Sequence, residues 1–191
     1  MTALARASVE SVRARIARAH EQAAARFRDL FIAGQTPPTV HLELLTDALI
    51  ENAEGVRLHG RAYDIENGLM TPRYENFDVH REPEAILEYW LVISEITGSA
   101  VWRMTRLIAS AEEYDDALRR MQLPRIVRAI VGSFLPSVEI ADDGTALLEV
   151  TVYTRADEER IERRQLFLDE HNEFHFHGRE LIAEGRGGIS V

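Results

Sequence analysis

One stretch decides the fold of the C-terminal part of this chain: Gln165-Leu166-Phe167-Leu168-Asp169-Glu170-His171-Asn172-Glu173-Phe174-His175-Phe176-His177. Side chains of a β-strand alternate between two faces, so each half of the stretch can form a strand with distinct sides. The centre, residues 170–172, is typical of a three-residue loop, in which Asn172 tolerates a left-handed backbone. The stretch therefore predicts an antiparallel hairpin. The expected cross-strand pairs are Asp169 with Glu173, Phe167 with His175, and Gln165 with His177.

This register gives the hairpin two faces of different chemistry. One face is apolar, and we assign it to the core: Leu166, Leu168, Phe174 and Phe176. The other face is mixed and polar: Arg163, Gln165, Phe167, Glu173, His175 and His177. The role of the polar face depends on whether the concave side of the sheet or bulk solvent lies over it.

The hairpin continues an antiparallel meander that begins further upstream. Strands are predicted at 137–141, 146–155, 160–169 and 173–183, with Asp142-Asp143-Gly144 as the first turn.

The N-terminal part predicts one long helix over residues 4–33, which Gly34 and the pair Pro37-Pro38 end. Apolar residues recur at steps of three and four and form one stripe: Val9, Val12, Ile16, Ala19, Ala23, Phe27 and Leu30. Packing on the chain's own sheet and dimerisation through an overhanging end are equally compatible with this stripe.

Between helix and meander, residues 40–50 and 56–65 read as two strands joined by a turn at 52–55. The first could equally be a short helix, with one apolar side formed by Leu42, Leu45 and Leu49. Residues 66–83 read as a long irregular loop, a kind of segment that often acts as a lid.

A second hairpin is expected from residues 86–96 and 100–108 around Gly98-Ser99, a pair typical of a type II′ turn. Ser110 and Glu113 have the spacing of a capping box and predict the start of a helix. Pro124 is expected to break that helix and to begin another that runs through Ile130.

These elements predict a single α+β domain over 1–191. A long N-terminal helix and a helical insert would pack on a strongly curved, mostly antiparallel sheet or partly closed barrel of about eight strands. Its expected parts are the helix 1–33, a strand-rich half 39–108 with the loop 66–83, the helical insert 110–133, the meander 137–183 and a flexible tail 184–191.

Two absences exclude many functions. All 22 basic residues are Arg, and the chain contains neither Lys nor Cys. Without Lys there is no Schiff base and no P-loop lysine. Without Cys there is no thiol nucleophile, disulfide, iron–sulfur cluster or cysteine-ligated zinc.

The overall charge and hydropathy indicate the environment of the protein. The formal net charge is −10, which argues against a nucleic-acid-binding surface. No apolar run approaches the roughly 20 residues that span a bilayer, and the N-terminus has no apolar signal-peptide core. We therefore expect a cytoplasmic protein with no membrane contact.

The polar face of the last hairpin holds the candidate catalytic residues Glu173, His175 and His177. Histidine transfers protons readily near neutral pH, and an adjacent carboxylate fixes its tautomer and raises its basicity. His175 and His177 would act as base and acid, with Glu173 orienting them. Candidate ligand-binding residues, which would complete a pocket, are Tyr153, Gln165, Phe167, Trp90 and Trp102.

Two other interpretations of this face remain open. His175 and His177 have a spacing that recurs in metal sites on strands, but a third ligand would be needed, and we assign no metal ligand or cofactor. The other interpretation is an ordinary solvated strand face.

The sequence predicts most directly a protein that binds a small organic ligand in a pocket over the curved sheet. Catalysis, if present, would be the cofactor-free work of an isomerase, cyclase or hydratase. The alternatives are a non-catalytic interaction protein, which forms a homodimer through the N-terminal helix, and a His/carboxylate metalloprotein.

Overall fold

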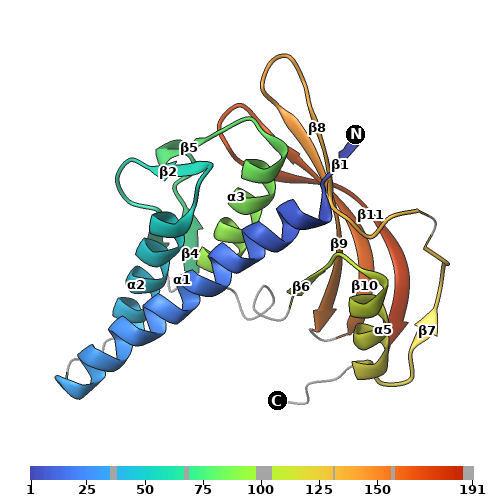
Figure 1. The fold of residues 1–191 in the computed structure, drawn as a ribbon, viewed down its shortest axis with the longest axis horizontal. Helices are drawn as coiled ribbons and strands as arrows, with labels where there is room; N and C mark the ends of the chain where they lie inside the picture. The colour runs from blue at the N-terminus through green and yellow to red at the C-terminus, as the bar shows by residue number, and fades with distance from the viewer. Residues whose placement is uncertain (35–37, 67–68, 98–104, 131, 156–157, 187–191) are drawn as a thin grey trace.

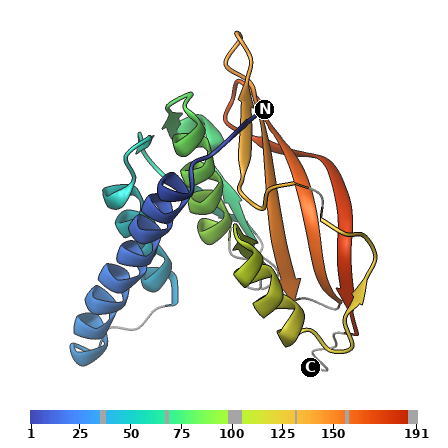
Figure 2. The same cartoon turned by 45° about the vertical axis from the view of Figure 1, so that its right-hand side comes forward.

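The computed structural model describes residues 1–34, 38–66, 69–97, 105–130, 132–155 and 158–186. It confirms the predicted α+β class, since a long N-terminal helix and further helices pack on a curled antiparallel sheet (Figure 1). The helices α1, α2 and α3 gather on one side of the molecule and the long strands on the other (Figure 2). Among the described residues, no helix combines the length and the apolar character needed to cross a membrane.

The main sheet has seven strands, and its longest members come from the C-terminal meander. The strands are β1 Thr2–Ala3, β6 Thr105–Ile108, β7 Arg125–Ile126, β8 Ser137–Ile140, β9 Ala146–Arg155, β10 Glu159–Leu168 and β11 Phe174–Gly185. Their order is β1-β8-β9-β10-β11-β7, and β6 pairs with the half of β9 that lies beyond β8. The four predicted meander strands are confirmed as β8 to β11.

The other elements form a helical layer with two small sheets. They are α1 Arg6–Ile32, α2 Pro38–Asn52, β2 Val56–Leu58, β3 Tyr63–Glu66, β4 Leu69–Pro72, the 3-10 turn η1 Tyr74–Asn76, β5 Phe77–Val79, α3 Pro83–Ile96 and α5 Ala111–Arg120. Strand β2 pairs with β5, and β3 pairs with β4.

The main sheet carries a hydrophobic core on each face. On β9, Leu148, Val150 and Val152 belong to a large core that they share with α1, α2 and α3. Tyr153, the next residue, points to the opposite face and belongs to a second core with Ala117 of α5. Helix α5 therefore lies across the sheet from the other helices.

The predicted N-terminal helix is confirmed as α1. Val9, Val12, Ala19 and Ala23 of its stripe are buried, and α1 packs against α2 and α3. The stripe therefore serves the chain's own core.

The hairpin expected from residues 86–96 and 100–108 is wrong, because residues 83–96 form helix α3. Its buried residues occupy nearly the whole circumference: Ala85, Ile86, Leu87, Glu88, Tyr89, Trp90, Val92, Ile93 and Ile96. A helix that is buried on all sides has no single apolar stripe, so its sequence resembles that of a buried strand.

Two signals at the start of α3 favoured a helix. Pro83 occupies the first helical turn and Glu84 lies beside it, where a negative charge is stabilised by the helix dipole.

The predicted Gly98-Ser99 turn lies outside the described residues. Strand β6, which would have completed the hairpin, pairs with β9 instead.

Three further predictions are corrected. Residues 40–50 lie in helix α2, the alternative that the leucine spacing indicated, with Leu45 and Leu49 buried. Residues 56–65 contain β2 and the start of β3, which pair with downstream strands rather than with 40–50. Residues 66–83 hold β4, η1 and β5 instead of an irregular loop.

The helix expected after Pro124 is also wrong. The chain there forms β7, which pairs with β11 at Ala183 and Glu184. The backbone amides of Val127 and Arg128 then donate to the carbonyl of Ile182, at 2.8 and 3.1 Å. Pairing with an open strand edge thus satisfies the backbone that a helix would have satisfied internally.

The capping prediction at Ser110 is confirmed. The Ser110 hydroxyl accepts a hydrogen bond from the backbone amide of Glu113 at 3.2 Å, and α5 follows. The Glu113 carboxylate in turn accepts a hydrogen bond from the amide of Ala109 at 2.6 Å, and the amide of Ser110 also acts on it.

The last hairpin has the predicted turn and only part of the predicted register. Phe167 pairs with His175, and Asn172 has a left-handed backbone with φ of 64°. Gln165 pairs with Gly178, because a β-bulge leaves His177 without a cross-strand partner. The assignment of Phe176 to the core is wrong, since its side chain is 61% exposed.

A buried ion pair joins the helices of the large core. Glu88 on α3 has a side chain only 1% exposed, and one of its oxygens lies 2.7 Å from Nε of Arg15 on α1. The other oxygen accepts hydrogen bonds from the backbone amides of Glu54 and Gly55, at 3.1 and 3.2 Å. A side chain at Gly55 would collide with Ala85, so the turn after α2 lies directly on α3.

Removing this carboxylate should destabilise the whole fold. We expect Glu88→Ala to lower the free energy of unfolding by about 3–5 kcal/mol, since it removes the buried partner of Arg15 and the acceptor of two backbone amides. The control is Glu54→Ala, which removes a 76%-exposed carboxylate 3.4 Å from the same Arg15 and should cost less than about 1 kcal/mol. Urea unfolding measures both variants, and equal losses would contradict this assignment.

Candidate functional site

The predicted catalytic residues lie on the surface at the turn between β10 and β11. Glu173, His175 and His177 are all exposed, and the His175 side chain is 49% accessible. The structure brings Glu173 and His175 together with a residue that the sequence interpretation left out of the site, Asp169. His177 lies at the bulge and does not join them.

Asp169 organises this turn. One carboxylate oxygen accepts the backbone amides of His171 and Glu173, at 2.8 and 2.9 Å, and the other lies 2.8 Å from Nε2 of His175. Side-chain ligand atoms of Asp169, Glu173 and His175 all lie within 4.8 Å of one another. The group therefore has the spacing of a small metal site as well as that of a carboxylate–imidazole pair.

The contact between Asp169 and His175 shifts the pKa of both side chains. The hydrogen bond to Asp169 raises the pKa of His175 above its usual value. Burial opposes ionisation of Asp169, but the hydrogen bonds from His175 and from the two backbone amides outweigh it and lower the pKa of this carboxyl.

The same turn is also anchored to the helical layer. The Tyr89 hydroxyl donates to the backbone carbonyl of Asn172 at 2.8 Å. The side-chain amide of Asn172 donates to the backbone carbonyl of Phe77 at 2.7 Å. The ring of Tyr89 stacks on Phe174, with centroids 5.6 Å apart. Asn172 thus has a structural role in holding this turn against α3 and β5, while Asp169 shapes the turn itself.

The predicted ligand-binding residues do not converge on this turn. Gln165 donates to Glu149 at 3.1 Å, and Phe167 lies beside His175 with ring centroids 6.5 Å apart. Trp90 is buried in α3. Trp102 lies outside the described residues. Tyr153 lies near the far end of β9 and lines a different feature.

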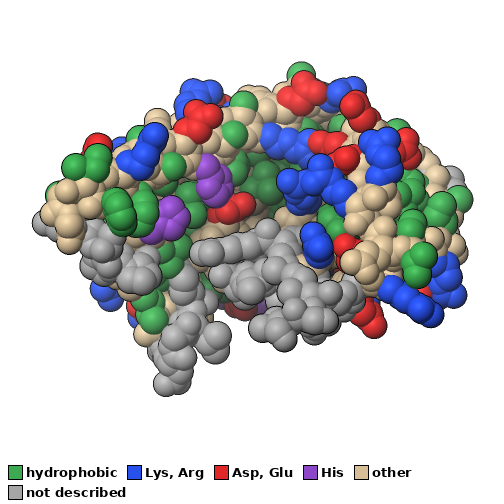
Figure 3. Space-filling view, turned by 90° about the horizontal axis from the view of Figure 1, so that it is seen from below, with side chains coloured by type: hydrophobic (Ala, Val, Ile, Leu, Met, Phe, Trp, Pro, Cys, Tyr) green, Lys and Arg blue, Asp and Glu red, His purple; other side chains and the backbone are tan. Residues whose placement is uncertain are grey.

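That feature is a cleft of about 620 Å³ around β6, at the edge of the main sheet. Figure 3 shows a hollow in the molecule, with hydrophobic side chains behind arginine and acidic side chains. The apolar part of the lining is Leu91, Leu107, Ile108 and Ala117, and the charged part is Arg6, Arg13, Arg106, Arg120, Glu95, Glu112, Glu113 and Asp116. The cleft therefore combines an apolar surface with both signs of charge.

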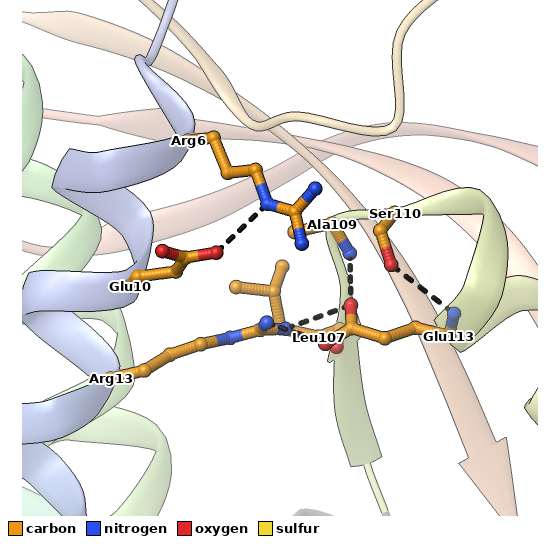
Figure 4. A network of polar contacts seen from close by, with 7 residues as sticks. All are labelled: Arg6, Glu10, Arg13, Leu107, Ala109, Ser110 and Glu113. Carbon is orange, nitrogen blue, oxygen red and sulfur yellow. Dashed lines mark hydrogen bonds and ion pairs between the residues drawn. The ribbon is translucent and has the colours of Figure 1, made fainter.

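A polar network beside the cleft joins α1 to β6 and α5 (Figure 4). Arg13 on α1 contacts both oxygens of Glu113, at 2.6 and 3.2 Å, and donates to the carbonyl of Leu107 at 2.7 Å. Arg6 pairs with Glu10 at 2.8 Å. Burial works against the charge on Glu113, but Arg13 and the Ala109 amide outweigh it and lower the pKa of this carboxyl.

Most arginines of the cleft are neutralised by neighbours. Arg120 pairs with Asp116 at 2.7 Å, and Arg6 and Arg13 are held in the network above. Arg106 on β6 is exposed and forms no ion pair within the described part of the chain.

Tyr153 contributes a neutral wall to the cleft. Its hydroxyl donates to the buried Glu159 at 2.9 Å. Burial and this hydrogen bond raise the pKa of Tyr153 to about 12, so the phenol keeps its proton at neutral pH. Tyr153 thus offers no general base there.

The cleft and the histidine turn are separate. Tyr153 pairs with Ile161 on β10, whereas His175 pairs with Phe167, six residues further along the same strand. At about 3.3 Å per residue, this places the two features about 20 Å apart. The sequence did not indicate the cleft as a whole, because its lining comes from four distant segments. Tyr153 is the one predicted ligand-binding residue, among those described, that lines it.

Comparison with known proteins gives no significant match to a family model, a curated protein or a solved structure.

A histidine beside the cleft provides a test of its electrostatics. Nε2 of His20 on α1 lies 3.2 Å from the carboxylate of Glu95, which lines the cleft, and this hydrogen bond raises the pKa of His20. A raised pKa in the folded state stabilises the fold below the unfolded-state pKa, and this contribution is lost as the pH rises through the folded-state pKa.

We expect Glu95→Gln to return the pKa of His20 toward its ordinary value. An NMR titration of the His20 ring measures this change. The control Glu21→Gln removes an exposed carboxylate next to His20 in the sequence and should leave the pKa nearly unchanged. Equal shifts in the two variants would show that general surface charge, and not the Glu95 contact, sets the pKa.

Proposed function

We propose that this protein binds a small organic molecule with an anionic group in the cleft around β6. The observation that carries the proposal is a hollow of about 620 Å³ in which apolar side chains lie beside Arg106, an arginine without a carboxylate partner in the described residues. Small-molecule sites have typical volumes of about 300–1,000 Å³ and combine an apolar lining with a few polar groups that orient the ligand.

The charges of the cleft favour an anionic ligand group at Arg106. A guanidinium presents a fork of N–H donors that matches a carboxylate or phosphate. The carboxylates of Glu113 and Asp116 are already engaged by Arg13 and Arg120. The apolar part of the ligand would lie against Leu91 and Leu107.

The proposal is for binding, not catalysis, at the cleft. Tyr153 retains its proton, and His175, His177 and Glu173 are distant from the lining. A ligand held by Arg106 would therefore lie far from His175, His177 and Glu173, the residues predicted to transfer protons.

Replacing Arg106 separates the anionic contact from the apolar one. We expect Arg106→Gln to weaken the binding of medium-chain fatty carboxylates about tenfold, which corresponds to about 1.4 kcal/mol, and to leave the matching alcohols unaffected. Calorimetric titration of the full chain measures both ligand series.

The control is Arg57→Gln, which removes an exposed arginine on β2, outside the cleft. It should bind carboxylates like the wild type. Binding that is absent from the wild type, or that Arg57→Gln weakens as much as Arg106→Gln, would refute the proposal.

Metal binding at Asp169, Glu173 and His175 is the second candidate, because their ligand atoms converge within 4.8 Å. A carboxylate and imidazole set suits zinc or manganese. We expect wild-type protein to bind Zn²⁺ stoichiometrically in a calorimetric titration, and His175→Ala to lose that binding. The control His59→Ala removes an exposed histidine elsewhere and should retain it. Absence of stoichiometric uptake by the wild type would leave Asp169 with its structural role alone.

A further inference from the structure

We propose a second ligand site, for an organic ammonium ion, in a hollow between α2 and β3 that is separate from the cleft around β6. The hollow has a volume of about 490 Å³. Its polar lining comes from one face of α2 and from the segment around β3: Glu43, Thr46, Asp47, Arg61, Tyr63 and Asp64. Leu58, Ala62 and Ile65 add apolar surface.

A buried hydroxyl in this lining lacks a partner. Thr46 is only 4% exposed, and its Oγ1 makes no hydrogen bond within the described structure. Threonine in a helix often bonds the carbonyl four residues earlier, and Thr46 does not use this option. A buried hydroxyl without a partner is unfavourable, and an ammonium group would supply the missing donor.

Two carboxylates flank Thr46 on the same face of α2. Glu43 and Asp47 are four residues apart, a spacing at which like charges repel. Neither carboxylate forms an ion pair with a described residue of the lining. Arg61, which also lines the hollow, limits the negative charge without pairing with them, while Asp64 is held by Arg73.

The phenol of Tyr63 lies close enough to Glu43 and Asp47 for their charges to act on it. Burial, followed by the charges of Glu43 and Asp47, raises the pKa of its phenol. The ring therefore remains neutral, and its face can contact an alkylammonium ion by a cation–π interaction.

The arrangement of these groups favours an organic cation over a metal ion. Convergence of ligand atoms with metal-site spacing occurs, in the described parts of the chain, at Asp169, Glu173 and His175 and not in this hollow. Carboxylates spread over a wall with an aromatic ring and apolar side chains match a charged amine on a short alkyl chain.

The test uses the full chain and simple probes: n-butylamine, 1,4-diaminobutane and, as an uncharged control, 1-butanol. We expect both amines to produce saturable NMR shifts of backbone amides in α2 and β3, and 1-butanol to produce none. Absence of saturable shifts with the amines, or equal shifts with 1-butanol, would overturn the proposal.

Two variants test the two carboxylates and the threonine hydroxyl separately. Glu43→Gln with Asp47→Asn should weaken amine binding about tenfold. Thr46→Val, which keeps the shape of the side chain, should raise the melting temperature of the free protein and weaken amine binding severalfold. A Thr46→Val variant that binds like the wild type would exclude the hydroxyl from the site.

The matched control is Glu21→Gln with Asp29→Asn, which also removes two exposed carboxylates from a helix but lies outside the hollow. It should bind the amines like the wild type, and an equal loss would mean nonspecific attraction to an acidic protein. Arg106→Gln should likewise leave amine binding intact, so failure of this site and failure of the carboxylate site are distinguishable.

Discussion

A carboxylate buried in the middle of α3 constrains the packing of the whole helical layer. Glu88 sits where the helix is covered on all sides, and a charge in that position must be compensated. Arg15 supplies the opposite charge from α1, and the amides of Glu54 and Gly55 supply hydrogen bonds from the turn after α2. One side chain thus fixes three segments relative to one another, with a specificity that apolar contacts alone do not give.

Helix α1 extends this constraint to the sheet. Arg13 and Arg15 are two residues apart, so they leave the helix about 200° apart around its axis. Arg15 reaches into the helical layer, while Arg13 reaches Glu113 and the carbonyl of Leu107 at the edge of the sheet. The cleft around β6 lies beside the contact that Arg13 makes. Arginine suits both positions, since its fork of donors satisfies several acceptors at once.

How well each helix or strand could be predicted from the sequence depended on whether one of its faces is exposed. Helix α1, and strands β8 to β11 over the part nearest the last hairpin, have one face in a core and a more exposed opposite face, so their sequences show the period of their structure. Helix α3 has no exposed face, and its period is hidden, although Pro83 and Glu84 marked its start. Helix α2 lies between these cases, and the spacing of Leu42, Leu45 and Leu49 correctly indicated the helix, which the sequence left open beside a strand.

The candidate sites were less predictable than the fold, for two physical reasons. A β-bulge changes the register without an evident sequence signal, and here it separated His177 from His175 and left Phe176 exposed. Hollows form between segments that are distant in the chain, so no local pattern contains them. The sequence does determine which charged side chains are available. With arginine as its only basic residue besides histidine, the chain pairs many carboxylates with guanidinium groups, whereas Arg106 and the acidic pair Glu43 and Asp47 line hollows without an ion pair to a described residue.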